Sequence, residues 1–128
     1  MTASADDLVA RARRRIGRVQ PDALDGVLAA GGLVVDIRPA AQRAEEGELD
    51  GAVVVERNVL EWRLDPSGEH RIPQVRDHAQ PVVVVCSQGY ASSLAAASLV
   101  DLGYSDATDL DGGYRAWQAW RERTAVRS

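Results

Sequence analysis

The sequence holds one cysteine, Cys86, and its surroundings suit a reactive thiol. Cys86 follows the four valines of residues 82–85 and opens a short loop that contains Gly89. A loop that curls back before a helix turns successive backbone N–H groups inward, and these donors bind an anion together with the helix N-terminus. Such a site stabilises a thiolate, the nucleophilic form of cysteine, and it would hold a persulfide anion in the same way. We therefore expect Cys86 to act as a nucleophile.

The loop has two other interpretations besides a nucleophilic cysteine. A lone cysteine is often only a small buried apolar residue, with Gly89 as an ordinary turn and Ser92 and Ser93 as ordinary helix caps. A phosphatase or arsenate reductase would instead use an arginine six residues after the cysteine to bind the transferred oxyanion. That position is Ser92 in this chain, which disfavours phosphate chemistry.

The rest of the chain alternates short apolar runs with helical patterns. We expect strands at 33–37, 52–55, 82–85 and 107–110, and helices within 1–18 and at 22–30, 40–46, 92–102 and 113–123, with 56–80 irregular. This alternation predicts an α/β fold with a parallel sheet covered by helices on both faces. Ligands bind such folds beyond the carboxyl ends of the strands, where Asp36, Arg38 and Cys86 are expected.

Composition and charge exclude several classes of protein. A chain of 128 residues fits one domain, and one cysteine permits neither an internal disulfide nor a cysteine-rich zinc site. His70 and His78 have poor ligand spacing, so we expect no metal site. The segment around Asp6 and Asp7 does not resemble a secretory signal, so we expect no signal peptide, and the sequence has no apolar window long enough to span a bilayer. We therefore expect a cytoplasmic protein that does not engage membranes.

The charge is unevenly spread between the first residues and the remainder. Residues 1–18 carry a net charge of +3, which leaves −7 for residues 19–128. We expect the five arginines of this segment to lie mostly on the solvated face of an N-terminal amphipathic helix that packs on a domain formed by 19–128. The acidic remainder would repel phosphates, so we expect no nucleic-acid partner.

Four stretches of the sequence carry motifs in a fixed order. They are Val34–Arg38 (Asp-x-Arg at a strand end), Gly47–Ala52 (Gly-x-x-x-Gly-Ala), Cys86–Ser92 (Cys-x-x-Gly-x-x-Ser) and Leu110–Trp117 (Gly-Gly-x-x-Ala-Trp). Together these motifs resemble those of the single-domain rhodanese family of sulfurtransferases, over about residues 19–120.

The resemblance implies a three-layer rhodanese-like fold with a mostly parallel sheet of about five strands. It implies an enzyme that moves sulfane sulfur from a small donor such as thiosulfate to a thiol or cyanide, through a persulfide on Cys86 and without a cofactor. The residues expected to bind the substrate or the persulfide are Ser87, Gln88, Gly89, Tyr90, Ala91 and Ser92. The alternative is a persulfide carrier or a regulatory binding module without turnover. The oligomeric state is left open.

The loop departs from the pattern of thiosulfate-specialised members, because Ser87 and Gln88 stand where they have Arg and Lys. Any cationic recognition of the donor must then come from arginines outside the loop. The candidates, each expected to be solvated, are Arg57, Arg63, Arg71 and Arg76.

Other conspicuous residues are expected to be structural. Asp36 and Arg38 should support the site by anchoring neighbouring loops. Glu48 and Asp50, where the family usually has His and Pro, should alter only the local turn. Trp62 either walls the pocket or packs on the surface. The last helix should bury a stripe made of Tyr114, Trp117 and Trp120.

Overall fold

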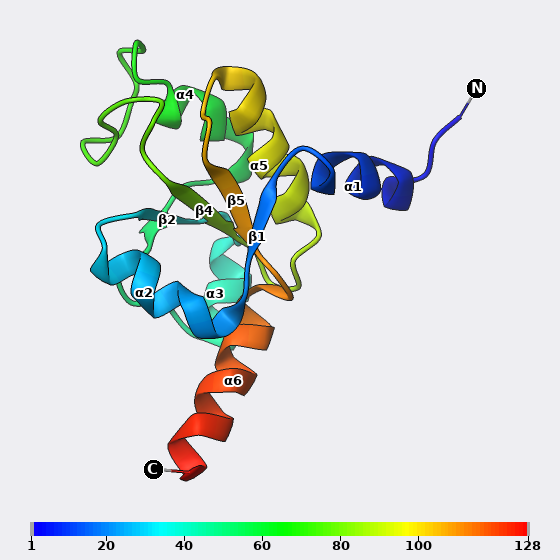
Figure 1. Ribbon diagram of the computed structural model, residues 1–128, viewed down its shortest axis with the longest axis vertical. Helices are drawn as coiled ribbons and strands as arrows, with labels where there is room; N and C mark the ends of the chain where they lie inside the picture. Colours follow the sequence, from blue (N-terminus) through cyan, green and yellow to red (C-terminus); the bar gives the residue numbers. More distant parts are fainter. Residues whose placement is uncertain (1, 128) are drawn as a thin grey trace.

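The computed structural model describes residues 2–127, and within them a parallel sheet lies at the centre of the molecule (Figure 1). Its strands, in the spatial order β1-β5-β4-β2-β3, are β1 (Gly17–Val19), β5 (Ala107–Leu110), β4 (Val82–Val85), β2 (Leu33–Asp36) and β3 (Val53–Val54). Each neighbouring pair is parallel. The predicted α/β fold with about five parallel strands is confirmed.

Helices cover both faces of this sheet, as the sequence predicts. They are α1 (Ala5–Arg13), α2 (Leu24–Ala29), α3 (Ala40–Glu46), α4 (Leu60–Leu64), α5 (Ala91–Leu102) and α6 (Gly113–Arg127), with 3-10 turns at Pro21–Ala23 and Arg57–Val59. The side chains of α4 and α5 join the core on one face, and those of α2 and α6 join the core on the other. Among the described residues, no helix is both long and apolar enough to cross a membrane.

The central strand β4 is buried throughout, which its run of valines predicts. Side chains alternate across a strand, so Val82 and Val84 pack with α5 whereas Val83 and Val85 pack with α6. Cys86 continues this alternation on the α5 side. The pleat of β4 thus directs the thiol toward the face where α5 begins.

The N-terminal segment differs from its prediction. A capping box between Ser4 and Asp7 starts α1, but the helix ends at Arg13 rather than continuing toward residue 18. Residues Gly17–Val19 instead form the edge strand β1, paired with Thr108–Leu110 of β5. Three of the five arginines, Arg11, Arg14 and Arg15, are exposed as expected, whereas Arg13 and Arg18 are partly buried.

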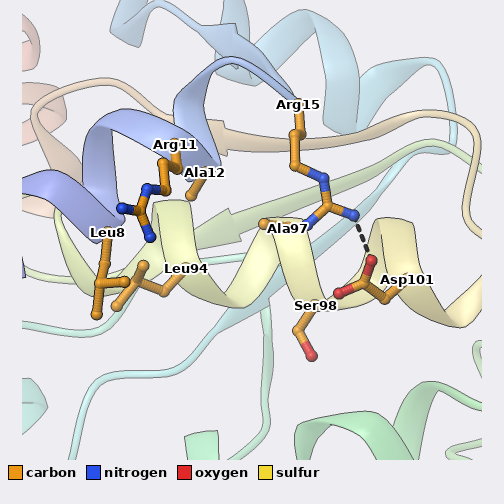
Figure 2. A pocket seen from close by; sticks show the side chains of 8 residues that line it. All are labelled: Leu8, Arg11, Ala12, Arg15, Leu94, Ala97, Ser98 and Asp101. Atoms are coloured by element: carbon orange, nitrogen blue, oxygen red, sulfur yellow. Dashed lines mark hydrogen bonds and ion pairs between the residues drawn. The ribbon is translucent and has the colours of Figure 1, made fainter. Parts of the chain in front are cut away.

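Helix α1 packs on the outer side of α5 (Figure 2). Ala12 is buried between the two helices, and Leu8 faces Leu94 across a shallow hollow of about 250 Å³. An ion pair between Arg15 and Asp101 joins the same two helices (Figure 2). These contacts fix the position of α1 along α5, from Leu94 near its start to Asp101 near its end.

The segment predicted to be irregular, 56–80, contributes more to the core than its sequence indicates. It contains α4, whose Leu60 and Leu64 are fully buried. The Tyr104 hydroxyl, from the loop after α5, donates a hydrogen bond to the Leu64 carbonyl at 2.6 Å and so anchors the end of α4. Burial raises the pKa of this phenol to about 12. This part of the chain therefore covers one face of the sheet.

Candidate active site

The thiol of Cys86 lies at the bottom of the loop that joins β4 to α5. Its Sγ accepts hydrogen bonds from the backbone N–H of Gly89 at 3.1 Å and from that of Ser92 at 3.4 Å. Ser92 lies in the first turn of α5, where backbone donors have no partner within the helix. Gly89 has a φ of +86°, a conformation that glycine adopts without strain. Two N–H groups thus converge on a sulfur whose residue is 7% exposed.

A hollow of about 290 Å³ opens beside this sulfur. Its walls are Gln42, Cys86, Ser87, Gln88, Tyr90 and Ala91. The structure therefore gathers all the predicted loop residues around the thiol: four of them line the hollow with Cys86, and Gly89 and Ser92 donate to its sulfur. Gln42, in α3, is an addition that sequence reasoning missed, since nothing in the spacing of residues 40–46 marks it.

The closing Gly-Gly motif lies against the backbone of the same loop. The N–H of Tyr114 donates to the Cys86 carbonyl at 2.8 Å, and that of Arg115 to the Ser87 carbonyl at 3.1 Å. A Cβ on Gly113 would lie 2.6 Å from the Cys86 carbonyl oxygen, which is closer than real contacts allow. Gly113 also has a φ of +70°. Only glycine permits the start of α6 to approach the loop this closely.

We name the first polar cluster around the loop the Glu46 network; it consists of Asp36, Arg38, Glu46, Ser87 and Arg115. Arg38 is 1% exposed and donates to both carboxylate oxygens of Asp36. Its Nη1 donates to Glu46 Oε1 at 3.2 Å. The other oxygen, Oε2, accepts from Ser87 Oγ at 2.6 Å and from Arg115 Nε at 2.9 Å. The network joins the end of β2 to the start of the Cys86 loop.

The opposite charges in this network keep Glu46 and Arg38 ionised although both side chains are largely buried. Burial raises the pKa of the Glu46 carboxyl, but hydrogen bonds from Ser87, Arg115 and Arg38 outweigh burial and hold that pKa below its ordinary value. Burial likewise lowers the pKa of Arg38, and Asp36 and Glu46 outweigh it, so that pKa is raised. The Arg38 guanidinium also lies over the Tyr114 ring, 4.0 Å from its centroid.

The second cluster, the Asp109 network, consists of Arg13, Arg18, Ser92, Ser93 and Asp109. Asp109 is fully buried in β5. It accepts from Arg18 Nε at 2.9 Å and Nη2 at 3.1 Å, and from the hydroxyls of Ser92 at 2.8 Å and Ser93 at 2.7 Å. The hydrogen bond with Asp109 raises the pKa of Arg18 above its ordinary value.

The two arginines of the Asp109 network both contact the loop itself. Arg13 Nη2 donates to the Gly89 carbonyl at 2.8 Å, and Arg18 Nη2 donates to the same oxygen at 3.0 Å. Arg13 also donates from Nε to Ser93 Oγ at 3.1 Å and lies over the Tyr90 ring. Among the described residues, the guanidinium groups that donate to the backbone of this loop therefore come from the N-terminal segment.

The arginines named from sequence as possible donor-binding cations lie elsewhere. Arg57 pairs with Glu61, Arg63 donates to the His70 carbonyl, and Arg71 donates to the Pro66 carbonyl. Neither these three nor the exposed Arg76 belongs to the lining of the Cys86 hollow.

The aromatic residues divide between core and surface. Trp62 is 60% exposed and does not line the hollow, so it packs on the surface. Tyr114 and Trp117 are buried against the sheet and Trp120 is partly buried beside them, which confirms the predicted stripe of α6. No group of three His, Cys, Asp or Glu side chains in the described part of the chain is placed to hold a metal ion.

Comparison with known proteins agrees with this geometry. The family model for the rhodanese-like domain matches residues 20–119. The thiosulfate sulfurtransferase GlpE of Pseudomonas fluorescens Pf0-1 is 34% identical over 101 residues, which cover 79% of this chain and 84% of the relative. The GlpE protein of Stutzerimonas stutzeri A1501 is 32% identical over 104 residues, with the same coverage of both chains.

Two solved structures share the fold. A protein of unknown function from Rhodopseudomonas palustris, described as a possible tyrosine phosphatase, superposes with a TM-score of 0.84 at 25% identity, covering 94% of this chain and 93% of its own. A rhodanese homologue from the extremely thermophilic bacterium Thermus thermophilus has a TM-score of 0.56 at 33% identity, covering 77% of this chain and 98% of its own. The chain therefore belongs to the rhodanese-like domain family, in which the two GlpE relatives are named as sulfurtransferases.

Proposed function

We propose that this protein is a sulfurtransferase that carries sulfane sulfur as a persulfide on Cys86, from a small donor to a thiol or cyanide acceptor. The observation that carries the proposal is the pair of backbone N–H groups, from Gly89 and Ser92, that converge on a buried sulfur beside an open hollow. Sulfur anions are the species that such donors stabilise.

The reaction has two nucleophilic steps. With thiosulfate, the Cys86 thiolate attacks the outer sulfur; a new S–S bond forms, the S–S bond of the donor breaks, and sulfite leaves with the electron pair. In the second step, a thiolate or cyanide attacks the outer sulfur of the persulfide, and the Cys86 thiolate is released. Negative charge stays on sulfur at each stage, within reach of the N–H groups of Gly89 and Ser92.

The Glu46 network supports the loop, and Ser87 is its one member that lines the hollow. Arg38 donates to both Asp36 and Glu46, and Glu46 accepts from the Ser87 hydroxyl at the start of the loop. We propose that Asp36 and Arg38 act on the reaction only by keeping Ser87 and the residues after it in place.

The single cysteine also decides how sulfur leaves. No second thiol exists in the chain to form a disulfide with a loaded Cys86. The sulfur must therefore pass to an external acceptor, and a reducing compartment such as the cytoplasm supplies thiols of that kind.

A persulfide carrier or binding module without turnover is the second candidate, favoured by the lining of the hollow. The side chains around the thiol, those of Gln42, Ser87, Gln88, Tyr90 and Ala91, are all uncharged. An anionic donor would find backbone N–H groups there but no cationic side chain. Rapid steady-state transfer from thiosulfate to cyanide at low donor concentration would exclude this candidate.

Phosphatase chemistry, which the description of the R. palustris neighbour mentions, is disfavoured by the position that would hold its arginine. That position is Ser92, which carries no charge to bind a phosphate. Its hydroxyl donates to Asp109. Hydrolysis of a phosphotyrosine analogue that is lost in Cys86→Ser would reverse this conclusion.

The test of the proposed function is the sulfur content of the protein after exposure to a donor. The wild type is treated with thiosulfate, a thiosulfonate or a low-molecular-weight persulfide, and its intact mass is measured. We expect one added sulfur on the wild type and none on Cys86→Ser, with a control variant, Ser105→Ala, at an exposed position behaving as the wild type. Full transfer activity in Cys86→Ser, or no added sulfur with any donor, would contradict the proposal.

A further inference from the structure

The Gly89 carbonyl is held by two guanidinium groups from the N-terminal segment. Arg13 comes from α1 and Arg18 from β1, and both donate to this one oxygen. Both residues precede residue 20, where the match to the rhodanese-like family begins. The loop around the proposed nucleophile is therefore completed by a part of the chain that lies outside the family match.

Both arginines are held firmly in this position. Arg18 pairs through two nitrogens with the buried Asp109, a geometry that fixes the plane of the guanidinium. Arg13 is placed by the packing of α1 on α5, through Leu8, Ala12 and the Arg15–Asp101 pair (Figure 2). Neither side chain lines the hollow, so neither is placed to bind the donor directly.

The hydrogen bonds to Gly89 orient the backbone that surrounds the sulfur. The described chain has no cis peptide, so the N–H of Tyr90 points opposite to the Gly89 carbonyl and away from the two arginines. Tyr90 lines the hollow. The N–H of Gly89, on the other side of the same residue, donates to Cys86 Sγ. Fixing the Gly89 carbonyl thus fixes the peptide plane that carries the Tyr90 N–H, and it limits the freedom of Gly89, whose own N–H donates to the sulfur.

We propose that Arg13 and Arg18 are positioning residues for the Cys86 loop: they hold the Gly89 carbonyl outward and so keep Gly89 in the conformation in which its N–H donates to the sulfur. Their positive charge also polarises the Gly89–Tyr90 peptide in the direction that favours an anion at Cys86. The geometry stands by itself, and its consequence for sulfur transfer rests on the proposed function. The N-terminal segment is thereby part of the active site.

The test uses Arg13, because its removal leaves no buried carboxylate without a partner, whereas loss of Arg18 would leave Asp109 uncompensated. Alkylation of Cys86 by iodoacetamide, a neutral reagent, is timed by intact mass at neutral pH. We expect Arg13→Met to slow alkylation by about threefold to tenfold and Arg13→Lys to restore part of the rate. Arg14→Met is the matched control, since Arg14 is exposed and should leave the rate unchanged.

The direction of the change separates positioning from a merely structural role. Loosening of the loop would expose the buried Sγ and speed alkylation, whereas misplaced amides slow it. Equal rates in Arg13→Met and Arg14→Met, or faster alkylation in Arg13→Met, would overturn the proposal.

The sulfur-transfer reaction supplies a second readout. In Arg13→Met we expect kcat with thiosulfate to fall by about threefold to tenfold while the KM for thiosulfate is unchanged, because Arg13 lies outside the hollow. A raised KM with unchanged kcat would instead make Arg13 a donor-binding residue and overturn the proposal. Alkylation needs no sulfur donor, so its result stands even if the wild type accepts no sulfur and the proposed function fails.

Discussion

The Glu46 network and the Asp109 network hold the same loop at two different points. The Glu46 network contacts the side chain of Ser87, at the start of the loop, and the Asp109 network contacts the carbonyl of Gly89, where the chain turns into α5. All members of the first lie within the family match at 20–119, whereas the second depends on Arg13 and Arg18, which precede it. Part of the support for this site thus lies within the family match, and part comes from the N-terminal segment that precedes it.

Removal of Arg38 should break the Glu46 network with the largest effect on stability. Arg38→Met would leave Asp36, which is 1% exposed, and Glu46 without their shared cation. We expect a loss of about 3–5 kcal/mol in the free energy of unfolding, measured by urea denaturation. The matched control is Arg43→Met, which removes a pair with the exposed Glu48 and should cost about 1 kcal/mol or less. Equal losses in the two variants would refute the ranking.

Neutralising Asp109 should break the second network with a smaller effect. Asp109→Asn keeps the shape of the side chain but removes the charge that pairs with Arg18, and its amide nitrogen faces donors. We expect a loss of about 2–3 kcal/mol, together with slower alkylation of Cys86, because Arg18 is no longer held at Gly89. Asp111→Asn, on the more exposed partner of Arg18, should change stability by less than about 1 kcal/mol. Alkylation of Cys86 at the wild-type rate in Asp109→Asn would contradict a role for this network in positioning the loop.

Acid should weaken the Glu46 network through its glutamate. The pKa of Glu46 is lowered in the folded protein, so the stabilisation it gives is complete above the ordinary glutamate pKa of about 4.3. It is lost as the pH falls below that value and through the lowered pKa. Urea denaturation at a series of pH values should show a shallower acid dependence in Glu46→Gln than in the wild type, with a loss of about 1–2 kcal/mol at neutral pH. If Glu46→Gln and the wild type lose stability equally as the pH falls, other carboxylates dominate the acid dependence.

Serine substitutions offer the finest comparison of the two networks. Ser93→Ala removes one donor to the buried Asp109, and Ser87→Ala removes one donor to Glu46, whose side chain is 9% exposed. We expect each to cost about 1 kcal/mol, with Ser93→Ala the more costly because Asp109 is fully buried. The reverse order in thermal or urea unfolding would show that burial of the acceptor does not set the cost.

Much of the fold follows from local patterns in the sequence. The valines of β4, the apolar run of β2 and the glycine after α5 predict their elements because burial and turn geometry act on neighbouring residues. The loop from Cys86 to Ser92 is predictable for the same reason, since its motif is contiguous and lies directly after a buried strand.

The contribution of the N-terminal segment could not be predicted in this way. Strand β1 has only three residues and no apolar alternation, so although Gly17 disfavours a helix, nothing local marks these residues as a strand. The pair between Arg18 and Asp109 joins residues 91 positions apart. Helical periodicity alone places Arg13 toward solvent, because it does not show that α5 and the loop lie beside that helix.

The loop around Cys86 also depends on residues that are synthesised after it. Its carbonyls accept from the N–H groups of Tyr114 and Arg115, and Arg18 is placed by Asp109. A nascent chain that has reached Cys86 holds the thiol and both N-terminal arginines, but not the groups that order them. The site can therefore assemble only after the ribosome has passed the start of α6. Until then, Cys86 lacks the ordered N–H groups that stabilise its thiolate.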